Sequence, residues 1–396
     1  MSNIPSIAMI PSAYKSGKLY SVLPSDGSAD LNFARTSEAT RVNQNSLIET
    51  VGSNVPRIDY KDGGCPKLLL EPQRTNIIPY SEDFSNAAWI KGNSTINANQ
   101  VISPDGTLNA DLIVTSAAGG GVSDGIGGSG DYSFSVFAKY KDIQFIRLRS
   151  TNSYAWFDIE NGSVGNTISA LDATIENYGN GWYRCTLVGN NTNTLVQVTC
   201  TEQNGANVGF GSVYLWGAQV EEGSYPTSYI PTSGATATRN AETSSKANIS
   251  NLINSSEGVL YFETKGFIDV PTFSRYIQLS KNGETGFNNS LIIQHRNNGF
   301  LRIYANGTGT SDVHFNIDID FTQNHKIAVL YKLNGYKLFI DGVSQPMYLT
   351  PTQTVFSGLD TLSFAYRGTY EWNGSIKDVR VYNKALTDQE LIALTS

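Results

Sequence analysis

The sequence predicts an all-β protein in which an N-terminal region precedes two β-sandwich domains. Three observations support this fold class. Only 16% of the 396 residues are charged, and glycine, asparagine, serine and threonine, which favour turns, take the place of charge. Tyrosine (21 residues) and phenylalanine (17 residues) are abundant and favour strands. Short runs of alternating apolar and polar residues occur on both sides of a stretch rich in Pro, Ser, Thr and Gly at residues 226–238.

Residues 1–75 form the first predicted region, which has little periodicity and many turn-forming residues. Pro5 and Pro11 interrupt its weak apolar patch, and no basic segment precedes that patch, so a signal peptide is not expected. Residues 1–30 are polar and broken by proline, which is typical of a segment that becomes ordered only on a partner. We therefore expect an attachment region here.

Residues 76–235 form the second region, which is predicted to be a jelly roll. Its strand runs lie at residues 132–140, 145–149, 182–188 and 213–220. Alternate positions of the first run share one face of a strand, and they hold Tyr132, Phe134, Val136, Ala138 and Tyr140. Strands at this density with turns between them indicate a sandwich or jelly roll.

Residues 236–245 are predicted to be a linker, and residues 246–396 a second jelly roll. Strand runs lie at residues 259–264, 276–279, 291–294, 301–304, 326–331 and 336–340. Asn334 and Gly335 form the strongest short hairpin signal, between the last two runs. One helix is expected at residues 388–394, because Thr387 and Glu390 have the spacing of a capping box.

Charge and length exclude several classes of protein. The net charge is −7 and no basic block exists to neutralise phosphates, so nucleic-acid binding is not expected. No segment reaches the roughly 20 apolar residues that span a bilayer, so membrane insertion is not expected either. Three cysteines are too few for a disulfide framework. Cys185 and Cys200 flank a polar turn, and they either pair across a symmetric hairpin or remain free thiols.

Two sequence patterns associated with catalysis or cofactor binding lack the context they need. Residues 125–130 match G-x-G-x-x-G and residues 121–125 match G-x-S-x-G, but a strand pattern follows where each motif requires a helix. No glycosidase signature is present, so an enzyme, a polysaccharide depolymerase, is only the third hypothesis. No cofactor is expected, although Ca²⁺ is possible, with Asp318 and Asp320 as weak candidate ligands on one face of a strand.

The third region resembles the concanavalin A-like, laminin-G-type lectin fold. The resemblance rests on residues 258–263, 334–342 and 372–391. The second region resembles a carbohydrate-binding-module jelly roll of the kind fused into phage fibres, on residues 71–76, 80–89, 181–184 and 214–223. The first region is similar to the leading part of phage head-spike and tail-fibre proteins, on residues 33–43, 55–60 and 65–72. Phages of gut Bacteroidetes, including the crAss-like group, are a plausible source.

These resemblances imply a virion fibre or spike subunit. Such a protein would be made in the host bacterial cytoplasm and displayed on the virion surface as a homotrimer. Its N-terminal region would attach to capsid or tail proteins, and its lectin-like domains would bind cell-surface glycans. The alternative is a purely structural or decorative fibre that binds no sugar.

A sugar site pairs aromatic platforms with polar side chains, because a pyranose has apolar ring faces and hydroxyl groups. In the second region the candidates are Arg147, Arg149, Tyr154 and Trp156. In the third region they are Tyr366, Arg367, Tyr370 and Trp372, in a loop that follows a strand. Local packing is the alternative role for Trp156 and Trp372. Trp182 and Trp216 lie within strand motifs and are expected in the core.

Overall fold

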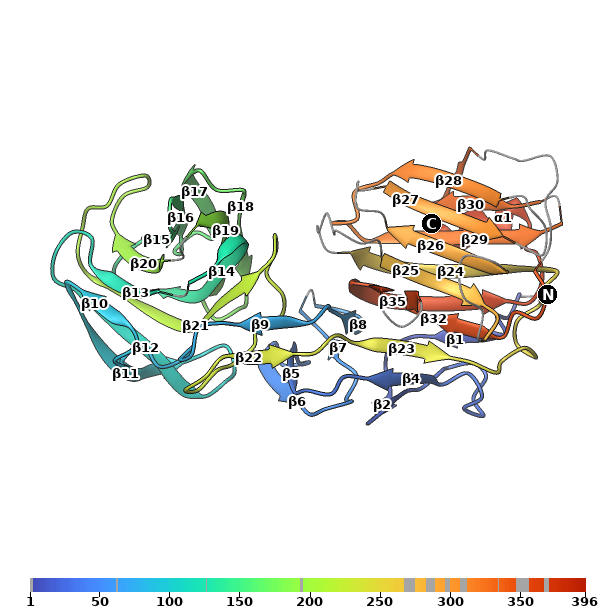
Figure 1. Cartoon of the computed structure of the whole chain (residues 1–396), viewed down its shortest axis with the longest axis horizontal. Helices are drawn as coiled ribbons and strands as arrows, with labels where there is room; N and C mark the ends of the chain where they lie inside the picture. The colour runs from blue at the N-terminus through green and yellow to red at the C-terminus, as the bar shows by residue number, and fades with distance from the viewer. Residues whose placement is uncertain are drawn as a thin grey trace. The chain divides into compact units, whose positions relative to one another are not determined.

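A computed structural model describes the chain except for residues 1–2, 62, 126, 193–194, 267–274, 283–288, 296–299, 307–311, 334, 347–355 and 367–369. Strands are the main regular structure of the described residues, with a single short helix among them, which confirms the all-β prediction (Figure 1). They divide into two compact units. Unit 1 contains residues 1–38, 52–72 and 240–396, and unit 2 contains residues 39–51 and 73–239.

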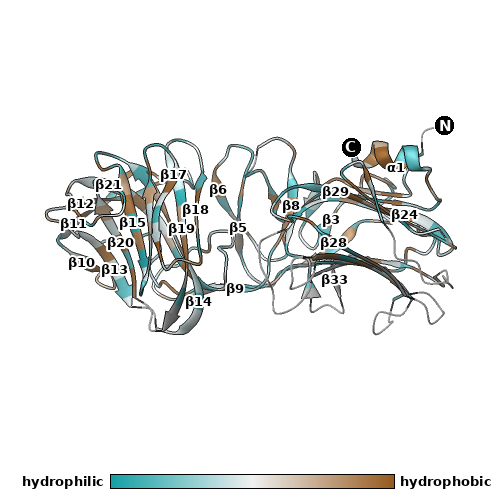
Figure 2. Ribbon diagram, turned by 90° about the horizontal axis from the view of Figure 1, so that it is seen from above, coloured by the Kyte–Doolittle hydropathy of each residue, from teal (hydrophilic) through white to brown (hydrophobic). Residues whose placement is uncertain are grey.

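Unit 1 is a sandwich of two sheets, seen as two layers in Figure 2. The order of the first sheet is β31 (Val343–Gln345), β30 (Lys337–Ile340), β29 (His325–Lys332), β24 (Glu257–Gly266), β35 (Gly374–Tyr382), β8 (Lys67–Leu70) and β7 (Ile58–Asp59), with β1 (Ile7–Met9) also paired to β35. The order of the second is β2 (Tyr14–Lys15), β3 (Lys18–Leu19), β4 (Leu31–Ala34), β23 (Thr243–Lys246), β32 (Thr361–Ser363), β25 (Arg275–Ser280), β26 (Ser290–His295), β27 (Phe300–Asn306) and β28 (Asp312–Asp318). A short ladder joins β33 (Ala365–Tyr366) and β34 (Tyr370–Glu371). All six strand runs predicted in residues 246–396 are confirmed.

Strand β24 is apolar on both faces because both faces are covered. Leu260 and Phe262 point into the core between the two sheets. Val259 and Tyr261 point the other way and pack in a second cluster with Leu391 of α1 (Asp388–Thr395). The predicted capping box of this helix is confirmed, since the Thr387 hydroxyl accepts from the Glu390 N–H and the Glu390 carboxylate accepts from the Thr387 N–H. Among the described residues no helix has the length and apolar character to cross a membrane.

The N-terminal residues are part of unit 1, in contrast to the expected partner-dependent arm. Ile7 and Met9 on β1 are buried in the core, and β1 pairs with β35 in the register Ile7 to Val381. Strands β4, β7 and β8 add to the same two sheets. The sequence lacks periodicity here because each strand is only two to four residues long. Residues 1–75 therefore do not form a separate region.

Residues 236–245 are not a linker in the structure. They contain β22 (Ala237–Arg239), which pairs with β9 (Arg74–Asn76), and the start of β23, which pairs with β4 and β32. The preceding polar stretch is also packed, since Thr227, Tyr229 and Ile230 are buried in unit 2. Polar residues form these strands because their backbone groups find partners far away in the sequence.

A buried ion network of four side chains joins the three segments of unit 1. The Arg57 guanidinium donates from Nη1 to Glu71 Oε2 (2.7 Å) and from Nε to Glu242 Oε1 (2.7 Å). Arg35 Nη1 donates to Glu242 Oε1 (2.8 Å), and its Nη2 donates to the Gly52 carbonyl (2.7 Å). The side chains of both arginines and of Glu242 are wholly buried, and that of Glu71 is 2% exposed. The two positive and two negative charges balance, which is the condition under which buried charges are tolerated.

The role of β1 gives a first testable prediction. We expect Ile7→Ala to lower the free energy of unfolding by about 2–5 kcal/mol, because it leaves a cavity beneath β35. Ile4→Ala is the matched control, since Ile4 is 67% exposed and its loss should change stability by less than about 0.5 kcal/mol. Chemical denaturation of the full chain measures both. Equal stability of the two variants would mean that the N-terminus is not part of the core.

Unit 2 is a second sandwich, with its own core of buried apolar residues. The order of its first sheet is β10 (Ile90–Gly92), β13 (Gly121–Gly125), β20 (Leu195–Thr201), β15 (Phe145–Ser150), β16 (Ser153–Asp158) and β17 (Ser163–Ile168). The order of its second sheet is β11 (Ser94–Ile102), β12 (Leu108–Thr115), β21 (Ser212–Glu222), β14 (Ser129–Tyr140), β19 (Trp182–Thr192) and β18 (Asp172–Asn177). A hairpin of β5 (Ala39–Val42) and β6 (Ile48–Val51) completes the unit. Trp182 and Trp216 are buried, as predicted.

The two cysteines of unit 2 are free and buried. Cys185 is on β19 and Cys200 is on β20, and these strands belong to different sheets, so the symmetric hairpin does not form. Burial raises the pKa of the Cys200 thiol to about 12 and also raises the pKa of Cys185. Both therefore behave as small core residues.

The two glycine motifs occupy β13 and the segment that leads into β14. Residues 121–125 form β13, and β14 begins at Ser129. Neither motif precedes a helix, so neither has the geometry of a dinucleotide-binding loop or of a nucleophile elbow.

Candidate functional site

The outer face of the first sheet of unit 2 brings together the four candidates of that region. Ile146, Leu148, Ala155 and Phe157 alternate with them and are buried in the core between the sheets. The intervening side chains of Arg147, Arg149, Tyr154 and Trp156 therefore share the opposite face. We call these four residues the Arg–Tyr cluster.

Strand register places the cluster in two rows across the sheet. The first row crosses all six strands and contains Ile90, Ser123, Gln197, Arg149, Tyr154 and Ile168. The second row contains Gly92, Gly121, Thr199, Arg147 and Trp156. The first row thus combines a tyrosine ring, a guanidinium, an amide and two exposed isoleucine side chains. These groups can contact both the hydroxyl groups and the apolar faces of a ligand.

Arg147 is nine-tenths buried, with 9% of its surface exposed. Its Nη2 donates to Thr199 Oγ1 (3.1 Å) and to Gln197 Oε1 (3.3 Å), both of which are neutral acceptors. Its Nε is buried and has no hydrogen-bond partner. Burial, and secondly the neighbouring Arg149, lower the pKa of this guanidinium.

Tyr154 lies against both arginines. The guanidinium carbon of Arg147 is 5.3 Å from the centroid of its ring, and that of Arg149 is 5.5 Å from it. These are cation–π distances, so the ring helps to hold two like charges close together. Arg149 and Tyr154 are each half-buried, and Arg149 Nε donates to the Thr151 carbonyl (2.8 Å). Both side chains remain accessible to a ligand.

Trp156 does not offer a free ring face, which corrects its assignment as a sugar platform. It is 3% exposed, and its Nε1 donates to the Ala206 carbonyl (2.7 Å). The ring of Tyr154 stacks beside it, with centroids 6.3 Å apart. In the turn that follows β20, the Thr201 hydroxyl lies within hydrogen-bond distance of the Ala206 carbonyl (3.1 Å) and the Val208 carbonyl (2.9 Å). Trp156 therefore supports Tyr154 from beneath this turn.

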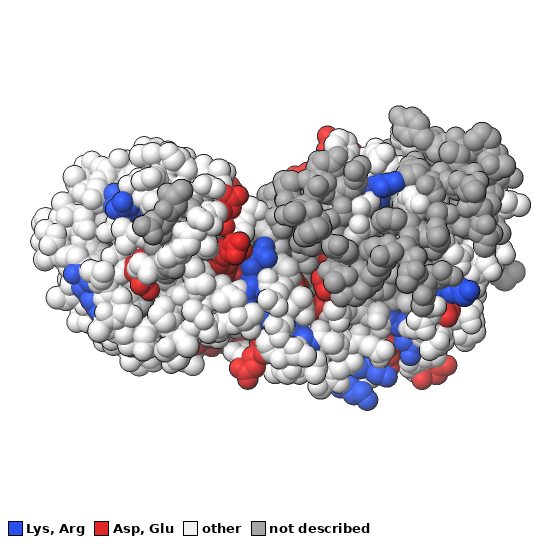
Figure 3. All heavy atoms as spheres, in the orientation of Figure 1, with Lys and Arg blue, Asp and Glu red and all other residues white. Residues whose placement is uncertain are grey.

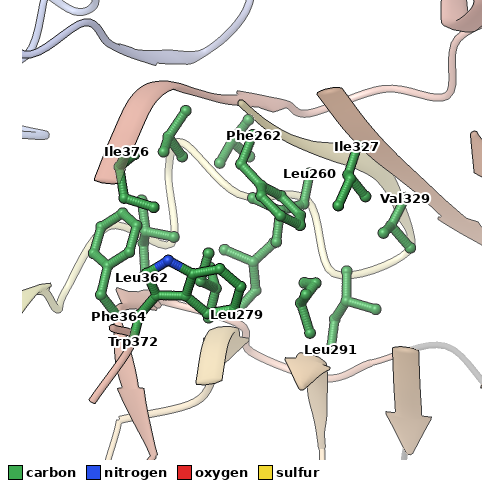
Figure 4. Close-up of a cluster of buried hydrophobic side chains, with 14 of the residues drawn as sticks. Leu260, Phe262, Leu279, Leu291, Ile327, Val329, Leu362, Phe364, Trp372 and Ile376 are labelled. Carbon is green, nitrogen blue, oxygen red and sulfur yellow. The ribbon is translucent and has the colours of Figure 1, made fainter. Parts of the chain in front are cut away.

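Trp372 belongs to the core of unit 1, which corrects its assignment as a binding residue. It is 1% exposed and lies among the side chains drawn in Figure 4. Its Nε1 donates to Thr264 Oγ1 (3.2 Å), and its ring packs edge-on against Phe321 with centroids 5.8 Å apart. The polar residues around it in the sequence suggested a loop, but its own side chain points into the sandwich.

The other candidates of this loop are only partly described. The backbones of Tyr366 and Tyr370 are paired in the register of β33 and β34, and Arg367 lies outside the described residues. The weak Ca²⁺ candidates Asp318 and Asp320 are exposed, and Asp320 accepts from the Thr322 N–H (2.9 Å). In the described part of the chain, no group of three His, Cys, Asp or Glu side chains could hold a metal ion.

Sequence reasoning missed a cavity of about 330 Å³ in unit 2. Its walls are mainly apolar and include Leu47, Ile102, Tyr178 and Trp182, together with Lys139. The lining residues come from separate segments, so no local pattern could have indicated it.

Comparison with known proteins assigns the fold of unit 1. The family model of the concanavalin A-like lectin/glucanases superfamily matches residues 268–392. Unit 1 contains a concanavalin A-like domain. The predicted lectin-type fold is thereby confirmed for this unit. No curated protein sequence matches the chain significantly.

Solved structures similar to the chain include carbohydrate-binding modules and toxin domains. The carbohydrate-binding module (CBM40) of a Ruminococcus gnavus IT-sialidase, bound to α2,3-sialyllactose, is 18% identical, with 38% of this chain and 91% of that chain covered and a TM-score of 0.32. The receptor-binding domain of botulinum neurotoxin mosaic serotype C/D is 16% identical, with 38% and 39% covered and a TM-score of 0.32. A mutant NanB sialidase from Streptococcus pneumoniae is 19% identical, with 38% and 26% covered and a TM-score of 0.32. These similarities are too distant to transfer a function to this chain.

Proposed function

We propose that this chain is a glycan-binding subunit of a virion surface fibre or spike, and that the Arg–Tyr cluster of unit 2 contacts the sugar. The observation that carries the proposal is the row of Gln197, Arg149 and Tyr154 on a solvent-facing sheet. Tyrosine offers a flat apolar surface at low cost in conformational entropy, and the amide and guanidinium offer hydrogen bonds to hydroxyl groups. A lectin-like fold in unit 1 agrees with this role.

The proposed fibre is made in the host cytoplasm and displayed on the virion as a homotrimer, and it binds glycans without turning them over. Three linked copies of a weak site raise avidity without any new contact. Attachment to capsid or tail proteins through the N-terminal residues would use the surface of a folded unit, since residues 3–38 are built into unit 1. A decorative fibre with no affinity for sugars is the alternative.

A glycan array with matched tyrosine variants tests the proposal. We expect Tyr154→Ala to weaken binding about tenfold, equivalent to about 1.4 kcal/mol, with little change in melting temperature. Tyr140→Ala is the control, because Tyr140 is exposed at the end of β14, on the other sheet of unit 2. Binding unaffected by Tyr154→Ala would remove the cluster from the site, and an array without any signal would favour the decorative fibre.

A further inference from the structure

The Arg–Tyr cluster carries two positive charges that are not paired with any carboxylate among the described residues. No carboxylate in the described part of the chain forms an ion pair with Arg147 or Arg149. Asp158 lies on β16 two residues beyond Trp156. Its carboxylate accepts from Gln144 Nε2 (2.8 Å) and Asn161 Nδ2 (2.9 Å). The Asp158 carboxylate thus bonds to amide groups. Among the described residues, no carboxylate balances the positive charges of Arg147 and Arg149.

Arg184 shows what a structural buried arginine looks like in the same unit. It is 2% exposed, and all three of its guanidinium nitrogens donate, to the Ser135 hydroxyl and the Thr227 carbonyl. Arg147 is almost as buried, yet its only hydrogen bonds come from Nη2, and its Nε has no partner. Burying a charge with an unsatisfied donor costs free energy, and an anion beside the Arg147 guanidinium would offset part of that cost.

We infer that the cluster binds the anionic group of an acidic glycan, a sugar that carries a carboxylate or a sulfate, between Arg147 and Arg149. This inference rests on the proposed function. Guanidinium groups bind such oxyanions through charge-assisted hydrogen bonds, which are stronger than bonds to neutral hydroxyls. The anion would offset the repulsion between the two arginines, and the sugar ring would contact Tyr154.

The net charge of the chain indicates that binding of an anion depends on particular side chains and not on the overall electric field of the protein. The net charge is −7, and charged atoms are sparse on the face of unit 2 seen in Figure 3. A polyanion is therefore not drawn to this protein by its overall field. Affinity for acidic glycans must then come from particular arginines, and removing one of them should abolish the preference.

The test is an array on which each acidic glycan is printed beside its neutral counterpart. Carboxylated glycans are paired with their methyl esters, and sulfated glycans with their desulfated forms. We expect the wild-type chain to bind one acidic class at least tenfold more strongly than its neutral counterparts, and binding to weaken as salt is added. Which class binds identifies the carboxylate or the sulfate as the recognised group.

Two charge variants complete the experiment. Arg149→Gln should reduce acidic binding at least tenfold, to the level of the neutral counterpart. Lys141→Gln is the control, because it removes the same charge from an exposed position of unit 2 and should leave binding unchanged. Equal binding of acidic and neutral glycans overturns the acidic preference and leaves the proposed function standing. Absence of binding to every glycan overturns both. Acidic binding that survives Arg149→Gln overturns the placement of the anion.

Discussion

Replacing Glu242 by glutamine is expected to lower the free energy of unfolding by about 3–5 kcal/mol, because it removes a wholly buried carboxylate that pairs with the buried guanidinium groups of both Arg35 and Arg57. Glu242 accepts from both Arg35 and Arg57, and it also accepts from the backbone N–H of Glu71 (3.0 Å). One residue thereby joins segments that are up to 207 positions apart in the sequence. Chemical denaturation of the full chain measures the loss.

Asp388→Asn is the matched control for this experiment. Asp388 pairs with Lys337 in the same unit, but its side chain is 57% exposed and that of the lysine is 43% exposed. Exposed ion pairs contribute about 0–1 kcal/mol, so this variant should stay close to the wild type. A loss of less than about 1 kcal/mol for Glu242→Gln would contradict the view that the network holds the N-terminal segments in unit 1.

Trp372→Ala is expected to lower the free energy of unfolding by about 3–5 kcal/mol and to leave glycan binding by the folded protein unchanged. The side chain fills the space between Phe262 and Phe321, and removing it also removes the hydrogen bond that its indole N–H donates to the Thr264 hydroxyl. Thermal denaturation and the glycan array together separate stability from binding. Trp372→Phe should retain part of the packing and cost less.

The opposite result for Trp372→Ala, a loss of glycan binding without a loss of stability, would identify Trp372 as a binding residue. Loss of glycan binding at an unchanged melting temperature contradicts its place in the core. Tyr154→Ala is predicted to behave in that opposite way, so the two variants serve as controls for each other.

The local alternation of apolar and polar residues was sufficient to predict strands. It did not predict which distant segments pack over the strands. The predicted strand runs all fall on strands of the two units, but most of the other strands were not predicted. The structure places Arg147, Arg149, Tyr154 and Trp156 on one face of the sheet because side chains alternate along a strand. The burial of Trp156 depends on a turn about 50 residues further along, whose Ala206 carbonyl accepts from its indole. No pattern near Trp156 carries that information.

The predicted domain boundaries differ from the observed units because contacts between distant parts of the sequence determine the units. Strand β1 is paired with β35, whose residues lie some 370 positions away in the sequence. Arg35 and Glu242 were both available in the sequence, but their contact depends on the assembled sandwich. Short strands and buried ion pairs depend on partners that are distant in the sequence. Strand periodicity, helix caps and turns depend on neighbouring residues, so they can be predicted from a short stretch of sequence.

A crystal structure of the full chain with a bound acidic oligosaccharide from the array tests the central claim most directly. The account predicts that the sugar lies on the outer face of β15 and β16, with its carboxylate or sulfate within hydrogen-bond distance of Arg147 and Arg149 and its ring against Tyr154. A sugar bound elsewhere, with this face unoccupied, would contradict it.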